Sequence, residues 1–264
     1  MGSWVLPESY RPFVGNAAAF ADCYVRVCTG TPAFTISDLP FQFVSKTIWA
    51  AFPWYDDGWG FITPLPSAGD WERLLLWSPQ TNSADLWIGR GQPTQDIFGG
   101  LKFAFLAALF AQHQGALLHA AAVMVDGEAV LFVGQSGQGK SHWAHQCQAL
   151  GYPVLDEDRL AVRVLDGRVW AFGVPWHPAP RLCSPVGAPV KSIYFLQQAL
   201  PDTRAPVTKP HATSLLVKAA LLPVYDPLAM QSVLDVLAQT ALQAQVGFVG
   251  RASDERFVAE TLAL

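Results

Sequence analysis

An eight-residue segment near the middle of the 264-residue chain has the composition of a loop that binds phosphate. It reads GQSGQGKS and fits the pattern G-x-x-x-x-G-K-[ST] at every position. Glycines allow backbone N–H groups to turn toward phosphate oxygens, and a following helix adds its positive N-terminal end. Lys140 is expected to reach the β- and γ-phosphates, and the Ser141 hydroxyl to ligate Mg²⁺. The loop therefore predicts ATP and Mg²⁺ as cofactors.

Two other motifs that share residues with this loop do not fit. A hydrolase nucleophile elbow requires G-x-S-x-G, but the fifth position is Gln138 for Ser136 and Trp143 for Ser141. The dinucleotide fingerprint G-x-G-x-x-G is not matched in this loop either. The predicted cofactor-binding residues are Gly134, Gln135, Ser136, Gly137, Gln138, Gly139, Lys140 and Ser141.

Three consecutive carboxylates, Asp156, Glu157 and Asp158, close a short apolar strand downstream of the loop. They should lie at the same end of a parallel sheet as the loop. Adjacent acids repel one another unless a cation lies among them, and Mg²⁺ between Ser141 and the triphosphate would relieve this repulsion. One carboxylate could also take the proton of an incoming hydroxyl. The alternative is a solvated turn.

Apolar segments predict the elements that position these residues. A strand over 129–133 runs directly into the loop, and a helix over 140–150, ended by Gly151, follows it. The turn dipeptide Asp126-Gly127 joins this strand to a β-like segment over 117–125. The other predicted elements are a buried helix over 97–114, strands over 153–155, 160–164, 168–172 and 191–196, and a helix that starts at Asp226-Pro227.

Residues 1–95 differ in composition from the rest of the chain. They contain seven of the ten Trp, with turn signals and short apolar alternations that indicate a mostly β lobe. Aromatic residues fill cores more often than they line ligand surfaces. The sequence therefore predicts an α/β (α+β) fold with a β-rich N-terminal lobe over 1–95. A nucleotide-binding domain over 96–264 follows, and its C-terminal part is helical.

Charge is sparse, since Lys, Arg, Asp and Glu make up 14% of the chain. This favours either a large core or apolar surface kept for a partner or for self-association into a homo-oligomer. No basic stripe is present, which disfavours a nucleic-acid partner. The apolar run from Phe103 to Ala111 is shorter than the ~20 residues of a membrane span, and the N-terminus lacks a signal-peptide pattern. A cytoplasmic chain without a membrane partner is expected.

Cysteines and paired histidines give weaker signals. The four cysteines have no C-x-x-C spacing, so we expect buried thiols instead of a zinc site or a disulfide framework. His142 and His145 lie three residues apart on the predicted helix after the loop. They could share a metal, but without a third ligand in spacing they are expected to face solvent. The cysteines are Cys23, Cys28, Cys147 and Cys183.

The segment 117–163 resembles the catalytic core of HPr kinase/phosphorylase and its relatives, which share a fold with ATP-dependent phosphoenolpyruvate carboxykinase. In that family the loop reads G-x-S-G-x-G-K-S, as it does here. An acidic pair follows the loop lysine by 17 and 18 positions, where Glu157 and Asp158 stand. A histidine precedes the same lysine by 21 positions, where His119 stands.

The resemblance implies roles for these residues. Lys140 and Ser141 would hold the nucleotide and the metal, and Asp158 would be a metal-side carboxylate. Glu157 takes the position of the base, and His119 lies near the transferred phosphate. The first ~95 residues resemble the family only loosely, as a β-rich lobe beside the nucleotide core.

The chain departs from the family in two places. The usual first acid is Asp, one methylene shorter than Glu157, so Asp156 is an alternative base. The R-G-L-G signature of the HPr-directed members is absent after residue 158, and FGVPWH over 172–177, followed by Arg181, stands in its place. This pattern is similar to smaller HPr-kinase-like proteins of peptide natural-product gene clusters, some of which phosphorylate a serine on a precursor peptide. HPr itself is therefore not the expected substrate.

The leading hypothesis is an ATP-dependent, Mg²⁺-requiring kinase that phosphorylates a hydroxyl, of Ser or Thr on a peptide or small protein. One alternative is a sensor that binds ATP without turnover and docks a partner through its Trp-rich lobe; another is a kinase of a small hydroxylated metabolite. Four side chains near the site are candidates to stabilise charge on the transferred phosphoryl group, and for each the alternative is a structural salt bridge or a surface charge. These candidates are Arg159, Arg163, His177 and Arg181.

Overall fold

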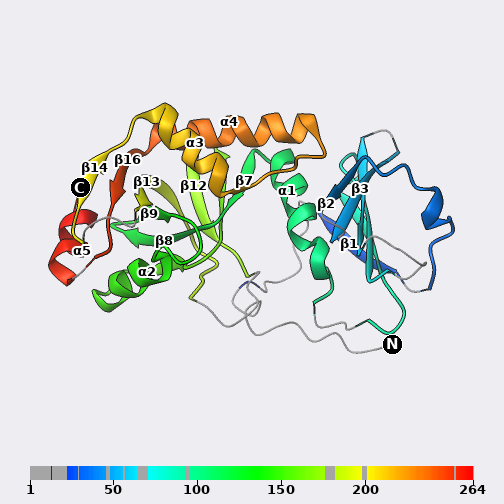
Figure 1. The fold of residues 1–264 in the computed structure, drawn as a ribbon, viewed down its shortest axis with the longest axis horizontal. Helices are drawn as coiled ribbons and strands as arrows, with labels where there is room; N and C mark the ends of the chain where they lie inside the picture. Colours follow the sequence, from blue (N-terminus) through cyan, green and yellow to red (C-terminus); the bar gives the residue numbers. More distant parts are fainter. Residues whose placement is uncertain are drawn as a thin grey trace. The chain divides into compact units, whose positions relative to one another are not determined.

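The computed structural model describes residue 13 and residues 23–28, 30–45, 48–55, 57–64, 71–92, 96–175, 182–197, 201–252 and 254–263. Its contacts divide the chain into two units (Figure 1). The first contains the described residues from 23 to 112 and the short segment Pro223–Pro227, and the second contains His113–Leu222 and the residues from Leu228 onward. The sequence predicts a boundary after residue 95, whereas this division falls after Gln112.

The first unit is built on a six-stranded sheet of order β1-β6-β5-β4-β3-β2. Neighbouring strands are antiparallel, except that β1 and β6 are parallel. The sheet agrees with the strand signals of this part of the sequence. Its strands are β1 (Tyr24–Cys28), β2 (Phe43–Ser45), β3 (Trp49–Trp54), β4 (Gly58–Thr63), β5 (Arg73–Ser78) and β6 (Ser83–Ile88).

Apolar side chains cover both faces of this sheet. On one face, Phe61 and Trp77 pack with Phe105 of α1 (Lys102–Gln112). On the other face, Phe52 and Ile62 are buried with residues around the short 3-10 helix η2 (Ile36–Asp38). The described Trp residues of this unit belong to these two clusters, so they fill the core as the sequence predicts.

The helix predicted over 97–114 is shorter in the structure. A 3-10 helix, η3 (Gly99–Leu101), precedes α1, and Gly99 has a left-handed φ of 51° that interrupts a regular α-helix. Buried Arg73 donates hydrogen bonds of 2.9 and 2.8 Å to the carbonyls of Asp96 and Ile97, which fixes the segment before η3. At the other end, Gln114 has a φ of 51° and leads directly into a strand.

Tyr225 completes the core of the first unit from a distant point in the sequence. Its hydroxyl donates a hydrogen bond of 2.8 Å to the Ala104 carbonyl, and burial raises its pKa well above the ordinary value. The neighbouring Asp226 accepts a hydrogen bond of 2.8 Å from Trp59 Nε1. The ring of Tyr225 contacts the rings of Phe43, Trp49, Trp59 and Phe61.

The second unit is built on a ten-stranded mixed sheet. Its main path is β10-β8-β9-β13-β12-β11-β7-β15, and β16 pairs with β13 and β14. Strands β9, β13 and β16 are parallel, whereas β10, β8 and β9 are successively antiparallel. The strands are β7 (Gly115–Leu118), β8 (Ala120–Val125), β9 (Glu128–Val133), β10 (Val154–Asp156), β11 (Leu160–Leu165), β12 (Arg168–Gly173), β13 (Gly187–Leu196), β14 (Arg204–Pro206), β15 (Ala220–Leu221) and β16 (Gln245–Val249).

Two expectations about this sheet are corrected. The sheet is mixed instead of parallel, but two antiparallel steps separate β10 from β9, so both strands run in the same direction. The segment 117–125, predicted as continuous, is two strands that part at His119. They part because β7 pairs with β11 and β15, whereas β8 pairs with β9 and β10. Overall, the two mixed sheets and their helices give an α+β fold.

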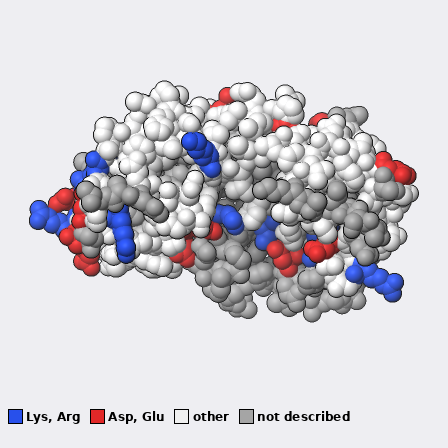
Figure 2. Space-filling view, viewed as in Figure 1, with Lys and Arg blue, Asp and Glu red and all other residues white. Residues whose placement is uncertain are grey.

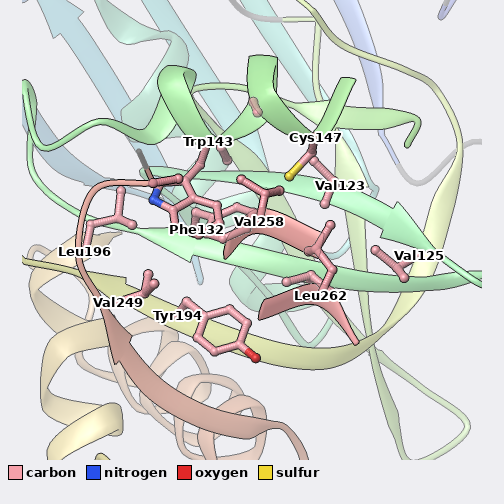
Figure 3. Packing of buried hydrophobic residues seen from close by; sticks show 14 of the residues in the cluster. Val123, Val125, Phe132, Trp143, Cys147, Tyr194, Leu196, Val249, Val258 and Leu262 are labelled. Carbon is pink, nitrogen blue, oxygen red and sulfur yellow. The ribbon is translucent and has the colours of Figure 1, made fainter. Parts of the chain in front are cut away.

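Helices cover both faces of the parallel strands (Figure 1). Trp143 of α2 (Lys140–Ala149) packs on one face with residues of the sheet and of α5 (Glu255–Leu262), as Figure 3 shows. Side chains alternate along a strand, so Phe248 faces away from Val249, which belongs to this cluster. Phe248 instead contacts His211 of α3 (Lys209–Ala219), with 5.6 Å between the ring centroids. The remaining helix is α4 (Pro227–Gln243).

The expectation of buried thiols holds fully for one cysteine. Cys147, a residue of α2, is completely buried, and burial raises its pKa to about 12. The three others are only partly buried. All four carry free thiols.

Charged groups are sparse on the face of the molecule in Figure 2, in line with the composition. Among the described residues, no helix is both long and apolar enough to cross a membrane.

Among the described residues, Trp143 has the largest fully buried side chain, and it anchors α2 to the sheet. We expect Trp143→Ala to lower the free energy of unfolding by about 3–5 kcal/mol, because it leaves a cavity beside Phe132. Urea denaturation followed by circular dichroism measures this change. Leu242→Ala, on an α4 side chain that is 63% exposed, is the control and should change it by less than about 0.5 kcal/mol. Equal losses in both variants would contradict the assigned packing.

Candidate active site

The predicted phosphate loop connects the carboxyl end of β9 to the first turn of α2. Gly137 and Gly139 have φ values of 81° and 99°, in the left-handed region that favours glycine. The start of the loop is tightly packed, because a Cβ on Gly134 would lie 2.7 Å from Gln138 Oε1. The same oxygen accepts a hydrogen bond of 2.5 Å from the Gln135 N–H. The loop is therefore folded back on itself at the edge of the sheet.

Lys140 begins α2, and its side chain turns back into the loop. It is 6% exposed, and Nζ donates hydrogen bonds of 2.9 and 3.0 Å to the carbonyls of Gly134 and Gln135. A buried ammonium requires such partners, because an unpaired buried charge is costly. The positive charge of Lys140 thus lies at the Gly134–Gln135 end of the loop.

The amino end of α2 adds positive potential to the same place. Among the described residues no side chain caps this end, and the first turn holds no acid. The first N–H groups of a helix lack intrahelical partners and attract anions. Half-buried Ser141, the second residue of α2, supplies a hydroxyl beside them. These groups suit a polyphosphate and the cation that accompanies it.

Asp156 holds the turn after β10. Its side chain is completely buried, and Oδ1 accepts hydrogen bonds of 3.0 Å from the N–H groups of Asp158 and Arg159. Oδ2 accepts a hydrogen bond of 3.1 Å from the N–H of Val174, just after β12. Glu157 is also buried, at 7% exposure. The alternative of a solvated turn therefore does not describe this acidic segment.

The next two carboxylates each pair with a histidine. His119 Nε2 lies 3.1 Å from Asp158 Oδ1. His145 Nε2, on α2, lies 3.2 Å from Glu157 Oε2, and the Leu182 N–H donates a hydrogen bond of 3.1 Å to Glu157 Oε1. Both acids are largely buried, whereas the side chain of His119 is 30% exposed. Two acid–histidine pairs thus lie at the edge where β10 ends.

His119 occupies the single residue between β7 and β8. Its backbone N–H donates a hydrogen bond of 2.8 Å to the carbonyl of Ala219, the last residue of α3. The break between the two strands therefore joins His119 to α3 as well as to Asp158. The resemblance implies that His119 is near the site, but the strand break that positions it has no clear signal in the sequence.

A cavity of about 400 Å³ adjoins the loop inside the second unit. His119 and the start of the loop form one side, and the ends of β13 and β16 and one face of α3 form the rest. The residues that line it are His119, Val133, Gly134, Gln135, Gln138, Phe195, Leu196, Gln197, His211, Leu215, Lys218, Ala219 and Phe248.

His142 and His145 do not form a common ligand pair. Half-buried His142 contacts the Ala252 carbonyl at 2.9 Å through Nε2, while exposed His145 contacts Glu157. Among the described residues, no group of three or more His, Cys, Asp or Glu side chains is arranged to hold a metal. Mg²⁺ needs only one or two protein carboxylates together with phosphate oxygens, so the oxygen donors of Ser141 and Asp158 fit it.

Two of the four candidates for charge stabilisation lie in the described part of the chain. Arg163 Nε donates a hydrogen bond of 2.9 Å to the His113 carbonyl, as expected for a structural role. The backbone of Arg159 belongs to the Asp156 turn. His177 and Arg181 lie outside the described residues.

Sequence reasoning missed the contacts of Val174, Leu182 and His145 with the acids. A partial signal is Gly173, where a Cβ would lie 2.2 Å from the Leu155 carbonyl oxygen and thereby block the approach of β12 to β10. Cys183 forms an isolated antiparallel β-bridge with Asp156 through the backbone. Burial and the nearby charges of Asp156 and Glu157 raise the pKa of its thiol.

Comparisons with known proteins give matches among solved structures only. No family model and no curated protein matches the chain. Among solved structures 61 chains match, and one of them is the HPr(Ser) kinase/phosphatase from Coxiella burnetii. It is 12% identical, with a TM-score of 0.31, over 56% of this chain and 93% of that chain. A likeness of this size establishes neither a shared fold nor a shared activity.

The contacts of Asp156 predict a structural effect of its replacement. We expect Asp156→Asn to lower the free energy of unfolding by about 1–3 kcal/mol. The amide replaces one of the two accepting oxygens with an NH₂ group, so at least one of the three backbone N–H groups loses its acceptor. Asp126→Asn is the matched control, because Asp126 is exposed in a turn with a φ of 51° that Asn tolerates. Chemical denaturation compares the two. An Asp156→Asn protein as stable as this control would rule out the structural role.

Proposed function

We propose that this chain is an ATP-dependent, Mg²⁺-requiring kinase that transfers the γ-phosphoryl group to Ser or Thr on a peptide or small protein. The observation that carries the proposal is the buried Lys140 ammonium inside a glycine-rich loop. This loop follows the carboxyl end of β9, and the acidic segment follows the carboxyl end of β10. Because β9 and β10 run in the same direction, the loop and the acids follow strand ends that face the same way.

Binding of the donor is assigned to the loop. Its backbone N–H groups and the uncapped end of α2 would hold the phosphates, and Lys140 would exchange its bonds to Gly134 and Gln135 for phosphate oxygens. Mg²⁺, held by Ser141 and Asp158, would neutralise charge on the phosphates. The oxygen-only donor set of these two residues supports that assignment.

Transfer is assigned to positioning and proton removal. The acceptor oxygen forms a bond to the γ-phosphorus, the bond from that phosphorus to the bridging β–γ oxygen breaks, and ADP leaves with its electron pair. The hydroxyl proton passes to a carboxylate. Glu157 and Asp158 are the candidates, because three backbone N–H groups already occupy the Asp156 carboxylate.

The two histidines are assigned to hold these carboxylates. His119 fixes one oxygen of Asp158 at 3.1 Å, and His145 with the Leu182 N–H fixes both oxygens of Glu157. Reacting groups held within a few tenths of an ångström of their working geometry lose little entropy at the transition state. His119 also borders the cavity, so in this proposal it would contact both Asp158 and the acceptor.

Loss of the loop ammonium tests nucleotide binding. We expect Lys140→Ala to weaken ATP binding at least about 100-fold, since a buried charge-assisted contact to phosphate contributes several kcal/mol. Titration calorimetry with ATP and Mg²⁺ measures the change, and circular dichroism checks the fold. The matched control is Lys191→Ala, on β13 near the end of β9 that is distant from the loop. Unchanged ATP affinity in Lys140→Ala would overturn the nucleotide site.

Replacement of the carboxylates separates a kinase from an ATP sensor. We expect Glu157→Gln and Asp158→Asn each to reduce phosphoryl transfer by about 10²–10⁴-fold, because each removes a base or a metal-side charge. The measurement is transfer of labelled phosphate from ATP to a pool of Ser/Thr peptides and, in parallel, to free amino acids and sugars. Asp166→Asn, in the exposed β11–β12 turn, is the control.

The outcomes of that screen distinguish the alternatives. Transfer to peptides that both variants lose supports the proposal. Transfer to a free amino acid or sugar alone identifies a metabolite kinase. ATP binding with no transfer to any acceptor, together with a partner captured by the wild-type chain, identifies a sensor and overturns the proposal.

A further inference from the structure

The cavity beside the loop adjoins the end of the donor that is transferred. The loop lysine reaches the β- and γ-phosphates in sites of this kind, and here its Nζ lies at the carbonyls of Gly134 and Gln135. Gly134 and Gln135 also line the cavity, together with His119, which contacts Asp158. A γ-phosphate bound at Lys140 would therefore lie next to this cavity, and an acceptor hydroxyl could approach it from there.

The walls of the cavity combine apolar side chains from the sheet and from α3 with one lysine of α3. Phe195, Phe248 and Leu215 supply the apolar surface. Lys218, exposed near the end of α3, supplies a positive charge, and none of the described lining residues is Asp or Glu. Apolar contact with a charge at the rim is a common arrangement for peptide side chains, with the rim charge selecting the partner.

We infer that this cavity is the acceptor site and that it takes a peptide segment with an apolar side chain beside the phosphorylated Ser or Thr and an acidic side chain against Lys218. The inference rests on the proposed kinase function and deepens it. The apolar residue of the acceptor lies against Phe195, Leu215 and Phe248. The hydroxyl lies at His119 and the loop, where the carboxylates can take its proton.

The size of the cavity and the link between Lys218 and His119 support a peptide segment as its occupant. A cavity of about 400 Å³ exceeds the space of a single hydroxymethyl group, so it has room for a neighbouring side chain. Lys218 precedes Ala219, whose carbonyl accepts the hydrogen bond from the His119 N–H. The residue that reads the acidic side chain is thus held next to the residue that borders the reacting hydroxyl. Lys218 is a specificity residue in this scheme and not a catalytic one.

The test is a Ser/Thr-centred peptide library in which each flanking position is varied in turn, with labelled ATP and the full-length chain. Wild type should prefer an acidic residue at one position and an apolar residue at another. Lys218→Glu should reverse the first preference toward Lys and Arg and raise KM for the best acidic peptide at least about fivefold, with kcat and ATP affinity unchanged. Leu215→Ala should weaken the apolar preference.

Lys191→Glu is the matched control and should leave both preferences intact. A reversal in Lys218→Glu, with acidic peptides replaced by basic ones, supports the acceptor assignment. Unchanged preferences in both α3 variants, with wild-type transfer intact, overturn this inference and leave the kinase proposal standing. A loss of ATP affinity in the α3 variants also overturns it, because the cavity would then hold the base of the nucleotide. No peptide transfer by wild type overturns both proposals.

Discussion

Burial of the Lys140 ammonium constrains the whole second unit. The charge has to be compensated where water is excluded, and the carbonyls of Gly134 and Gln135 can do so only if the loop curls back over the end of β9. That curl gives Gly137 and Gly139 left-handed φ values and brings the end of the Gln138 side chain to 2.7 Å from the position of a Cβ on Gly134. The N-cap of α2, Gly139, makes no side-chain hydrogen bond, so the positive end of this helix lies next to the Lys140 charge.

The three consecutive carboxylates have different hydrogen-bond partners. Asp156 is saturated by backbone N–H groups, an arrangement that builds the turn and commits its oxygens to it. Glu157 and Asp158 are each held by a histidine whose own side chain remains partly exposed. A partly exposed imidazole side chain can rotate away from a carboxylate more easily than backbone N–H groups that belong to a turn. The acidic segment thus contains one carboxylate bound by three backbone N–H groups and two that each contact a partly exposed histidine.

Local signals predicted much of this unit, and long-range pairing set the remainder. The strand before the loop, the helix after it and the hairpin at Asp126-Gly127 were predictable because turn residues and apolar runs are local. The break at His119 was not, because it arises from two strands that choose different partners far away in sequence. The contacts of Val174 and Leu182 with the acids escaped for the same reason. The helix predicted over 97–114, in the first unit, begins too early. Arg73, which is distant in sequence, holds the carbonyls of Asp96 and Ile97 outside the helix.

The position of Tyr225 bears on how the protein can be divided. Tyr225 lies in the segment Pro223–Pro227, between α3 and α4. The Tyr225 ring and the Asp226 carboxylate nevertheless complete the aromatic core of the first unit. Severing the chain after Gln112 would leave one fragment with an open gap among Trp and Phe rings, and the other with a bulky phenol detached from the Ala104 carbonyl. Neither fragment would be a complete folding unit, so a loss of activity in either would report on assembly instead of chemistry.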